Sequence, residues 1–215
     1  SCSSSPQQCQ ESGYSQNFIC DDRTDTGLGV ECYGEVKLFS ISSNNHTTSG
    51  NVLTSFIGES FGESNHNSIS IKTDGTLWTN ILWKNSTWLT ARSPPGTGRD
   101  HLIEIIINGR TSTESVKFSY QAPNITSIIS PPFKGGTMEI IGSNFGNSKD
   151  KLSVTTYDDV GCASDCTNSE INADGKVACQ FNNLGRKGTC RDVVIIVNEQ
   201  QSNKVEYCYE NDKGE

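Results

Sequence analysis

Short runs of alternating apolar and polar residues recur along most of the chain. Examples lie at residues 69–71, 103–107, 116–120 and 193–197, and most of them are rich in β-branched residues. A period of two is typical of a strand that buries one face. Because turn-forming residues separate the runs at intervals of about 8–12 residues, the pattern favours a sandwich of two packed sheets. We therefore expect an all-β fold.

The order of these elements repeats along the chain. Residues 34–62 (GEVKLFSISSNNHTTSGNVLTSFIGESFG) parallel residues 122–146 (APNITSIISPPFKGGTMEIIGSNFG), because each has two predicted strands and then Gly-x-x-Phe-Gly. Residues 99–120 and 191–209 also correspond, since both run from Arg-Asp to a strand that ends in aromatic-x-Tyr. A repeat of this length indicates tandem modules. We predict β-sandwich domains at residues 35–121 and 122–215, behind a cysteine-rich segment at residues 1–34.

Composition agrees with this organisation and narrows the range of partners. Only 33% of the 215 residues are hydrophobic and a single Met occurs, so the chain has few of the residues that form long amphipathic helices. The net charge is −8, with acidic and basic residues interspersed. Phosphate binding needs clustered Lys and Arg, so we expect no nucleic acid partner.

Nine cysteines in so polar a chain indicate an oxidising compartment and disulfide bonds. Four of them precede the first domain, which has no cysteine of its own, so we expect these four to form two bridges among themselves. A segment this short cannot bury a core without such covalent links. The other five belong to the second domain, and their odd number leaves one free or paired elsewhere. The disulfide candidates are Cys2, Cys9, Cys20, Cys32, Cys162, Cys166, Cys179, Cys190 and Cys208.

Three N-x-S/T sequons point to the same compartment, and we expect N-glycosylation at Asn45, Asn85 and Asn124. Together with the cysteines they predict a secreted or cell-surface protein. No apolar run of 18 or more residues is present, and the chain begins at Ser1 without Met. We therefore expect a processed ectodomain whose membrane anchor, if it has one, lies outside these residues.

Residues 123–146 resemble the opening of IPT/TIG domains, the immunoglobulin-like folds shared by plexins and transcription factors. The first copy departs at Ser42 and Ser43, which stand where the family has Ser-Pro. The resemblance implies two tandem immunoglobulin-like domains. Positions that fit the pattern are Pro123, Ile125, Ser130, Pro131, Gly135, Gly136, Ile140, Gly142, Phe145 and Gly146, with Gly50, Gly58, Phe61 and Gly62 in the first copy.

Tandem TIG modules, extracellular cysteines, sequons and an Asn/Ser-rich composition together resemble the dictyostelid Tgr (tiger) family of cell-surface proteins. That resemblance implies adhesion and self/non-self recognition by binding a related ectodomain on an apposed cell. We expect heterophilic rather than homophilic binding. A carbohydrate-binding module and a non-catalytic spacer of a surface receptor remain as alternatives.

Gly58-Glu59-Ser60-Phe61-Gly62 matches G-x-S-x-G, the elbow that presents a nucleophilic serine in α/β-hydrolases. That role needs a helix after the serine, and the following residues read as polar and then strand-like. The second copy has Asn144 at the position of Ser60. We therefore interpret the motif as a strand-to-turn signature in which Phe61 tucks into the sandwich edge, and we expect no enzyme and no catalytic residue.

Metal and cofactor sites are also not expected. His46, His66 and His101 lack zinc-site spacing, and Cys162 and Cys166 have no second pair at ligand spacing. Residues 21–27 faintly resemble a calcium loop, but Arg23 occupies a ligand position. A polar loop between cysteines is the better interpretation.

All three tryptophans fall within residues 77–89, as Trp78, Trp83 and Trp88. Tryptophan is enriched at interface hot spots, so one hypothesis is a protein-binding patch at these residues. The alternative is that the rings fill the core of the sandwich. A glycan on Asn85 would limit contact at that turn. The Pro/Gly-rich residues 91–101 are either a recognition loop or a simple connection.

Overall fold

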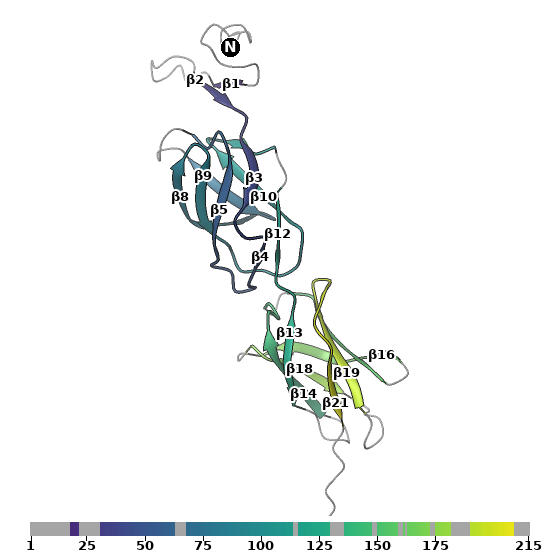
Figure 1. Cartoon of the computed structure of the whole chain (residues 1–215). Coiled ribbons are helices and arrows are strands. Elements are labelled where there is room, and N and C mark those ends of the chain that lie inside the picture. The colour runs from purple at the N-terminus through teal and green to yellow at the C-terminus, as the bar shows by residue number, and fades with distance from the viewer. Residues whose placement is uncertain are drawn as a thin grey trace, which may run out of the picture. The chain divides into compact units, whose positions relative to one another are not determined.

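The computed structural model describes residues 18–21, 31–62, 68–113, 116–129, 136–147, 150–158, 161, 163–172, 175–181 and 190–208. Every regular element in these ranges is a β-strand (Figure 1), which confirms the all-β prediction. None of them contains a helix long and apolar enough to cross a membrane.

The chain divides into two compact units. The first unit comprises the residues up to Asn44 together with Asn51–Pro94 and Asp100–Phe118. The second comprises Asn45–Gly50, Pro95–Arg99 and the residues from Ser119 onward.

The first unit is a sandwich of two antiparallel sheets. The alternation along the strands places one face of each in the core, as in β10, where Ile103, Ile105 and Ile107 are buried and Glu104 is exposed. One sheet has the order β3 (Lys37–Ile41), β5 (Leu53–Glu59), β9 (Trp88–Arg92) and β8 (Thr79–Asn85). The other contains β12 (Lys117–Tyr120), β10 (His101–Ile107), β6 (Ile69–Thr73) and β7 (Thr76–Leu77), with β11 (Arg110–Thr111) on β10.

Trp78 joins the two sheets of the first unit. Its ring makes edge contacts with Phe56 of β5 at 5.1 Å and with Phe118 of β12 at 5.4 Å between centroids. Its indole nitrogen donates to the Thr73 hydroxyl at 2.8 Å, which satisfies the polar atom of a ring that is only 3% exposed.

The first unit also contains a small antiparallel pair formed by β1 (Phe18–Asp21) and β2 (Glu31–Gly34). Its register sets Cys20 opposite Cys32. Cys2 and Cys9 lie outside the described residues, so the predicted pairing of the four N-terminal cysteines stays a prediction.

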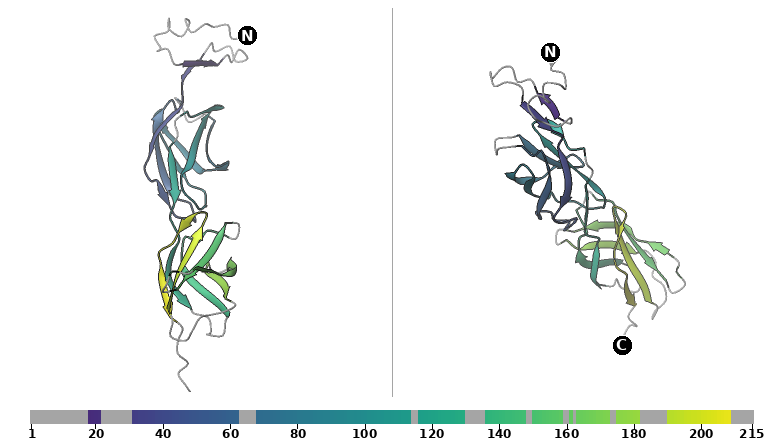
Figure 2. Two further views of the ribbon diagram at one scale, coloured as in Figure 1. Left: turned by 90° about the vertical axis from the view of Figure 1, so that its right-hand side faces the viewer. Right: turned by 45° about the horizontal axis from the view of Figure 1, so that its top comes forward.

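The second unit repeats the two-sheet arrangement (Figure 2). Met138, Ile140, Val154 and Ile195 belong to its buried core. One sheet has the order β13 (Asn124–Ile129), β14 (Gly136–Ser143), β18 (Val177–Phe181) and β17 (Thr167–Ile171). The other has β16 (Ala163–Asp165), β15 (Leu152–Tyr157), β19 (Cys190–Val197) and β20 (Gln200–Gln201), with β21 (Val205–Cys208) on β19. A two-residue strand, β4 (Asn45–His46), pairs in parallel with Ser119 and Tyr120, the last two residues of β12, and so belongs to neither of these sheets.

Two disulfides are formed within the second unit. Cys166 bonds to Cys179 of β18, and Cys190 of β19 bonds to Cys208, its direct partner in β21. The expectation of disulfides in this domain is therefore confirmed for these four residues. Cys162, the fifth cysteine, lies outside the described residues.

Candidate functional site

The G-x-S-x-G stretch is a turn in which an aromatic ring folds back over a glycine. A Cβ on Gly58 would collide with the Lys37 carbonyl oxygen and lie 2.5 Å from Cζ of Phe61. Ser60 has a left-handed backbone with φ of 62°, and Phe61 is fully buried. No helix begins at residues 60–62, and the next element among the described residues is the strand β6, whereas a nucleophile elbow leads directly into a helix.

The second copy has the same geometry. A Cβ on Gly142 would collide with the Asn124 carbonyl oxygen and lie 2.6 Å from Cζ of Phe145. Asn144, at the position of Ser60, has φ of 60°. The two turns therefore share a conformation as well as a sequence pattern, and the residue at the third position is a turn residue in both.

In the first unit this turn holds the tip of the β8–β9 hairpin. The Gly58 amide donates to the Thr87 carbonyl at 3.0 Å, and the Phe61 amide donates to the Ser86 carbonyl at 2.9 Å. The Trp83 indole nitrogen donates to the Phe61 carbonyl at 3.1 Å. These bonds fix the hairpin tip to the end of β5.

The structure separates the three tryptophans that sequence analysis grouped together. Trp78 lies in the core, so it has no surface to offer a partner, and the core alternative describes it. Trp83 is half-buried and shares a face with the buried Leu89, its cross-strand partner. Trp88 is 40% exposed. Only Trp88 presents much of its indole to solvent.

Trp88 belongs to a row of residues that crosses all four strands of its sheet. In this row Ile57 pairs with Trp88, and Trp88 pairs with Asn85. Ile57 also pairs with Ser40, beside a register shift that adds Phe39 to β3. Because Phe56 and Gly58 on either side of Ile57 are buried, this row lies on the outer face of the sheet.

The outer face of this sheet is unusually apolar. Among the described residues, eight large hydrophobic side chains are exposed, and five of them lie on β3, β5, β8 and β9. We call these five the outer patch: Phe39, Leu53, Ile57, Leu82 and Trp88. Sequence analysis identified only Trp88 among them, because the other four look like ordinary strand residues until the bulges and register assign their faces.

Charged groups lie at the ends of the outer patch. Lys37 pairs across the strands with Glu59 at one end, and Arg92 pairs with Leu53 at the other. Arg92 also donates to the Asn51 carbonyl at 2.8 Å. An apolar centre with a polar rim is the usual composition of a protein-binding surface.

The three predicted glycosylation sites are all exposed. Asn45 lies on β4, Asn124 begins β13, and Asn85 ends β8. The Asn85 side-chain oxygen accepts hydrogen bonds from the amide and the hydroxyl of Thr87, each at 2.9 Å. Each asparagine is therefore accessible to solvent, and glycosylation itself stays a proposal.

Residues 91–101 are held in place at their centre. Thr97 is buried in the second unit, where its hydroxyl donates to Asp150 at 2.6 Å and accepts from the Asn198 amide at 2.6 Å. The Gly98 amide donates to the side chain of Gln200 at 3.1 Å. These contacts favour a structural role for the loop over the recognition alternative.

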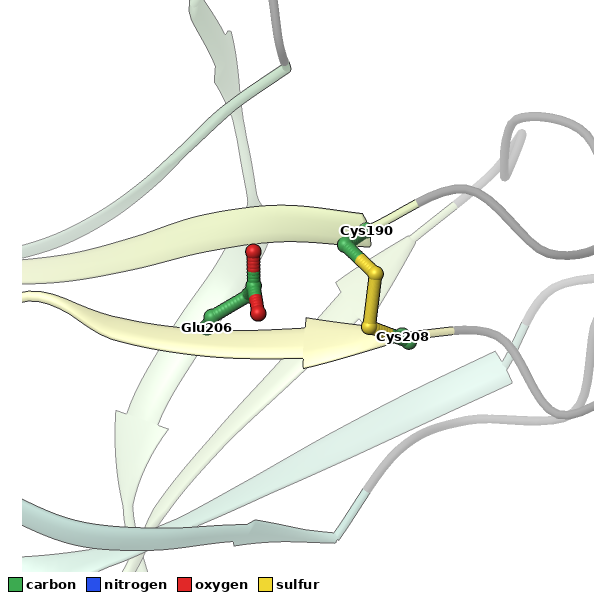
Figure 3. Close-up of side chains that lie close together, drawn as sticks. All are labelled: Cys190, Glu206 and Cys208. Atoms are coloured by element: carbon green, nitrogen blue, oxygen red, sulfur yellow. A yellow bond between two sulfur atoms is a disulfide. The ribbon is translucent and has the colours of Figure 1, made fainter.

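Metal-binding residue types come together at one place in the described part of the chain. Cys190, Glu206 and Cys208 lie close to one another (Figure 3), but the two cysteines form a disulfide and offer no thiolate. His46 is fully buried, and His101 is hydrogen-bonded to Asp74. His66 and all of residues 22–27 lie outside the described residues.

Comparison with protein families matches residues 38–120 to the IPT/TIG domain. The chain therefore contains an IPT/TIG domain. It is the first of the two copies, whose opening departs further from the family pattern than that of the second copy. Comparison with curated proteins finds no match.

Comparison with solved structures finds similar chains at low sequence identity. The extracellular region of plexin A4 is 13% identical to this chain, with a TM-score of 0.39. The match covers 85% of this chain and 19% of the plexin chain. The Yersinia pseudotuberculosis adhesin InvE is 8% identical, with a TM-score of 0.46. The match covers 81% of this chain and 58% of the InvE chain. Two fibronectin type III domains of chicken tenascin are 12% identical, with a TM-score of 0.49. The match covers 82% of this chain and 99% of the tenascin segment. The chain thus spans about a fifth of the plexin chain and over half of InvE.

Proposed function

We propose that this chain is an extracellular recognition module that binds another protein through the outer patch of its first unit. The single observation that carries the proposal is the outer patch itself. Monomeric proteins rarely leave large apolar side chains grouped on one open sheet face unless a partner covers them. Here the grouped side chains lie on adjacent strands, with Ile57 directly opposite Trp88.

The extracellular location is supported by covalent chemistry. Disulfides persist in oxidising compartments, and Cys166–Cys179 and Cys190–Cys208 are both formed. All three sequon asparagines are exposed. We propose that a membrane anchor, if present, lies outside these residues, and that the domain boundaries follow the repeat at residues 35–121 and 122–215.

The partner we propose is a related ectodomain on an apposed cell, as the resemblance to the Tgr family implies. Binding is heterophilic rather than homophilic and serves adhesion and self/non-self recognition. The Lys37–Glu59 pair at one end of the outer patch and Arg92 at the other offer charged groups to a complementary rim on a different ectodomain. Many weak copies on two membranes then supply avidity.

A matched pair of substitutions tests the surface. Leu53→Glu places a charge on the outer patch, and Leu77→Glu places one on the other sheet of the same unit. The two leucines are similarly exposed, at 55% and 54%. Surface plasmon resonance against related ectodomains and against the chain itself should show at least a tenfold weaker interaction for Leu53→Glu alone, about 1.4 kcal/mol. Equal effects of the two changes, or no binding by the native chain, would refute the proposed surface.

The carbohydrate-binding alternative rests on the exposed indole of Trp88, since aromatic faces suit sugar rings. Glycan-array binding that is lost in Trp88→Ala would favour it over protein recognition. The spacer alternative predicts that partner binding survives deletion of the first unit. We assign no catalytic residue, cofactor or metal to the chain.

A further inference from the structure

The sequon at Asn85 lies in a short, well-held hairpin turn. Ser86 and Thr87 form the two-residue loop between β8 and β9, and Asn85 and Trp88 flank it as a cross-strand pair. Directly paired residues share one face of a sheet, with Cβ atoms about 5 Å apart. The asparagine and the exposed indole are therefore neighbours on the outer face.

The side chain of Asn85 is held in one orientation. Its oxygen accepts from both the amide and the hydroxyl of Thr87, which leaves the amide nitrogen as the atom that would carry a sugar. The tip itself is fixed by the bonds from Gly58 and Phe61 to Thr87 and Ser86. A sugar on Asn85 would thus start from a fixed point beside Trp88.

We propose that Asn85 carries an N-linked glycan whose innermost N-acetylglucosamine packs on the indole of Trp88. The sugar comes from a lipid-pyrophosphate-linked oligosaccharide in the secretory pathway. The Asn85 amide nitrogen bonds to the anomeric carbon, the bond from that carbon to the pyrophosphate oxygen breaks, and the nitrogen loses a proton to solvent. The lipid pyrophosphate leaves with the electron pair of the broken bond.

Packing against the sugar accounts for the exposure of Trp88. The C–H face of a pyranose ring is apolar, and an indole is the largest flat apolar surface that a protein offers. The other two sequons lack this arrangement, since Asn45 pairs with Ser119 and Asn124 with Ser143. They serve as internal controls.

This inference rests on the proposed extracellular location and divides the outer patch. The glycan covers the β8–β9 half, around Trp88. Phe39, Leu53 and Ile57, on β3 and β5, remain open to a protein partner.

The test uses the full chain, secreted from a glycosylating eukaryotic host with Asn45→Gln and Asn124→Gln so that Asn85 is the remaining sequon. An endoglycosidase trims the folded protein to one N-acetylglucosamine, and an amidase removes the glycan completely by hydrolysing the side-chain amide, which leaves aspartate at position 85. We expect the trimmed protein to keep the melting temperature of the untrimmed one. Complete removal should lower it by about 4 °C, a shift typical of one modest interaction in a domain of this size.

The same treatment of a Trp88→Ala variant supplies the control. We expect a much smaller shift there, because the ring that the sugar contacts is absent and only the conversion of Asn85 to aspartate remains, and we expect Trp88→Phe to retain part of the shift. If Trp88→Ala is not secreted, the shift in melting temperature of Trp88→Phe is compared with that of the protein that retains Trp88. Equal shifts with and without an aromatic ring at position 88 would overturn the inference.

Mass spectrometry of the chain with all three sequons separates this inference from the proposed location. Glycans on Asn45 and Asn124 but not Asn85 would refute the Asn85 site while supporting an extracellular protein. No glycan at any sequon would refute both. A glycan on Asn85 supports the site and allows the melting experiment to decide the packing.

Discussion

Phe61 covers Gly58 so closely that a Cβ on the glycine would lie 2.5 Å from the ring. Phe145 covers Gly142 in the same way at 2.6 Å. The spacing Gly-x-x-Phe is thus a packing relationship: the residue without a side chain accepts the ring of the residue three positions later. This explains why the pattern recurs in both copies with no shared chemistry.

Gly58→Ala should therefore destabilise the first unit strongly. Its Cβ would meet the Lys37 carbonyl oxygen as well as the ring, and a paired backbone carbonyl cannot move aside. We expect a loss of about 3 kcal/mol in the free energy of unfolding, as for severe overpacking. Gly75→Ala is the control, because open space surrounds that glycine and only its φ of 79° is unfavourable, worth about 1 kcal/mol. Similar losses in chemical denaturation would contradict the packing argument.

Ser60 should tolerate substitutions that accept a left-handed backbone. With φ of 62° at Ser60 and 60° at Asn144, Ser60→Asn and Ser60→Gly should stay within about 0.5 kcal/mol of the native free energy of unfolding. Ser60→Val should cost more, since β-branched residues fit this conformation poorly. Partner binding should be unchanged in Ser60→Gly. Loss of a hydrolytic activity in Ser60→Gly would instead revive the nucleophile hypothesis.

The tryptophans should differ sharply when replaced. Trp78→Ala removes a core ring that contacts Phe56 and Phe118, and should cost about 3–5 kcal/mol. Trp83→Phe loses the hydrogen bond to the Phe61 carbonyl, about 1 kcal/mol. Trp88→Ala in protein without glycans should cost less than about 1 kcal/mol, because its ring is exposed. Thermal denaturation of the three variants checks the order, and a Trp88 effect as large as that of Trp78 would show that the ring is buried.

Removing the Cys190–Cys208 bridge should weaken the second unit. The bond closes a loop between residues 18 apart, for which the chain-entropy estimate is about 3 kcal/mol. Cys190→Ser with Cys208→Ser should show this loss in chemical denaturation under oxidising conditions. Peptide mapping without reduction should join Cys166 to Cys179 and Cys190 to Cys208, and any other pairing of these residues would contradict the structure.

Local patterns could be predicted from the sequence because their causes are local. The period of two along 103–107 indicated a half-buried strand, and β10 buries Ile103, Ile105 and Ile107. The matched Gly-x-x-Phe-Gly signatures indicated two similar turns, and the backbone has φ near 60° at Ser60 and Asn144. Both depend on the conformations of a few consecutive residues.

The faces of residues near a bulge could not be predicted in the same way. A register shift between Trp83 and Asn85 adds Lys84 to β8, so Trp83 shares the face of Leu89 while Asn85 shares the outer face of Trp88. Without the bulge, strict alternation would place Trp83 and Asn85 on the same face of β8. The bulge reverses that, and it becomes visible only when the partner strand is in place.

The sequence by itself determined the all-β class, the half-buried strand pattern and the two Gly-x-x-Phe turns, because these follow from nearest neighbours and from residue type. Only the tertiary structure decided which tryptophan is buried, which cysteines meet in the second unit, and that Asn85 lies beside Trp88. Those outcomes depend on the pairing register of strands that are distant in the chain. A shift of one residue in that register exchanges core and surface along a whole strand.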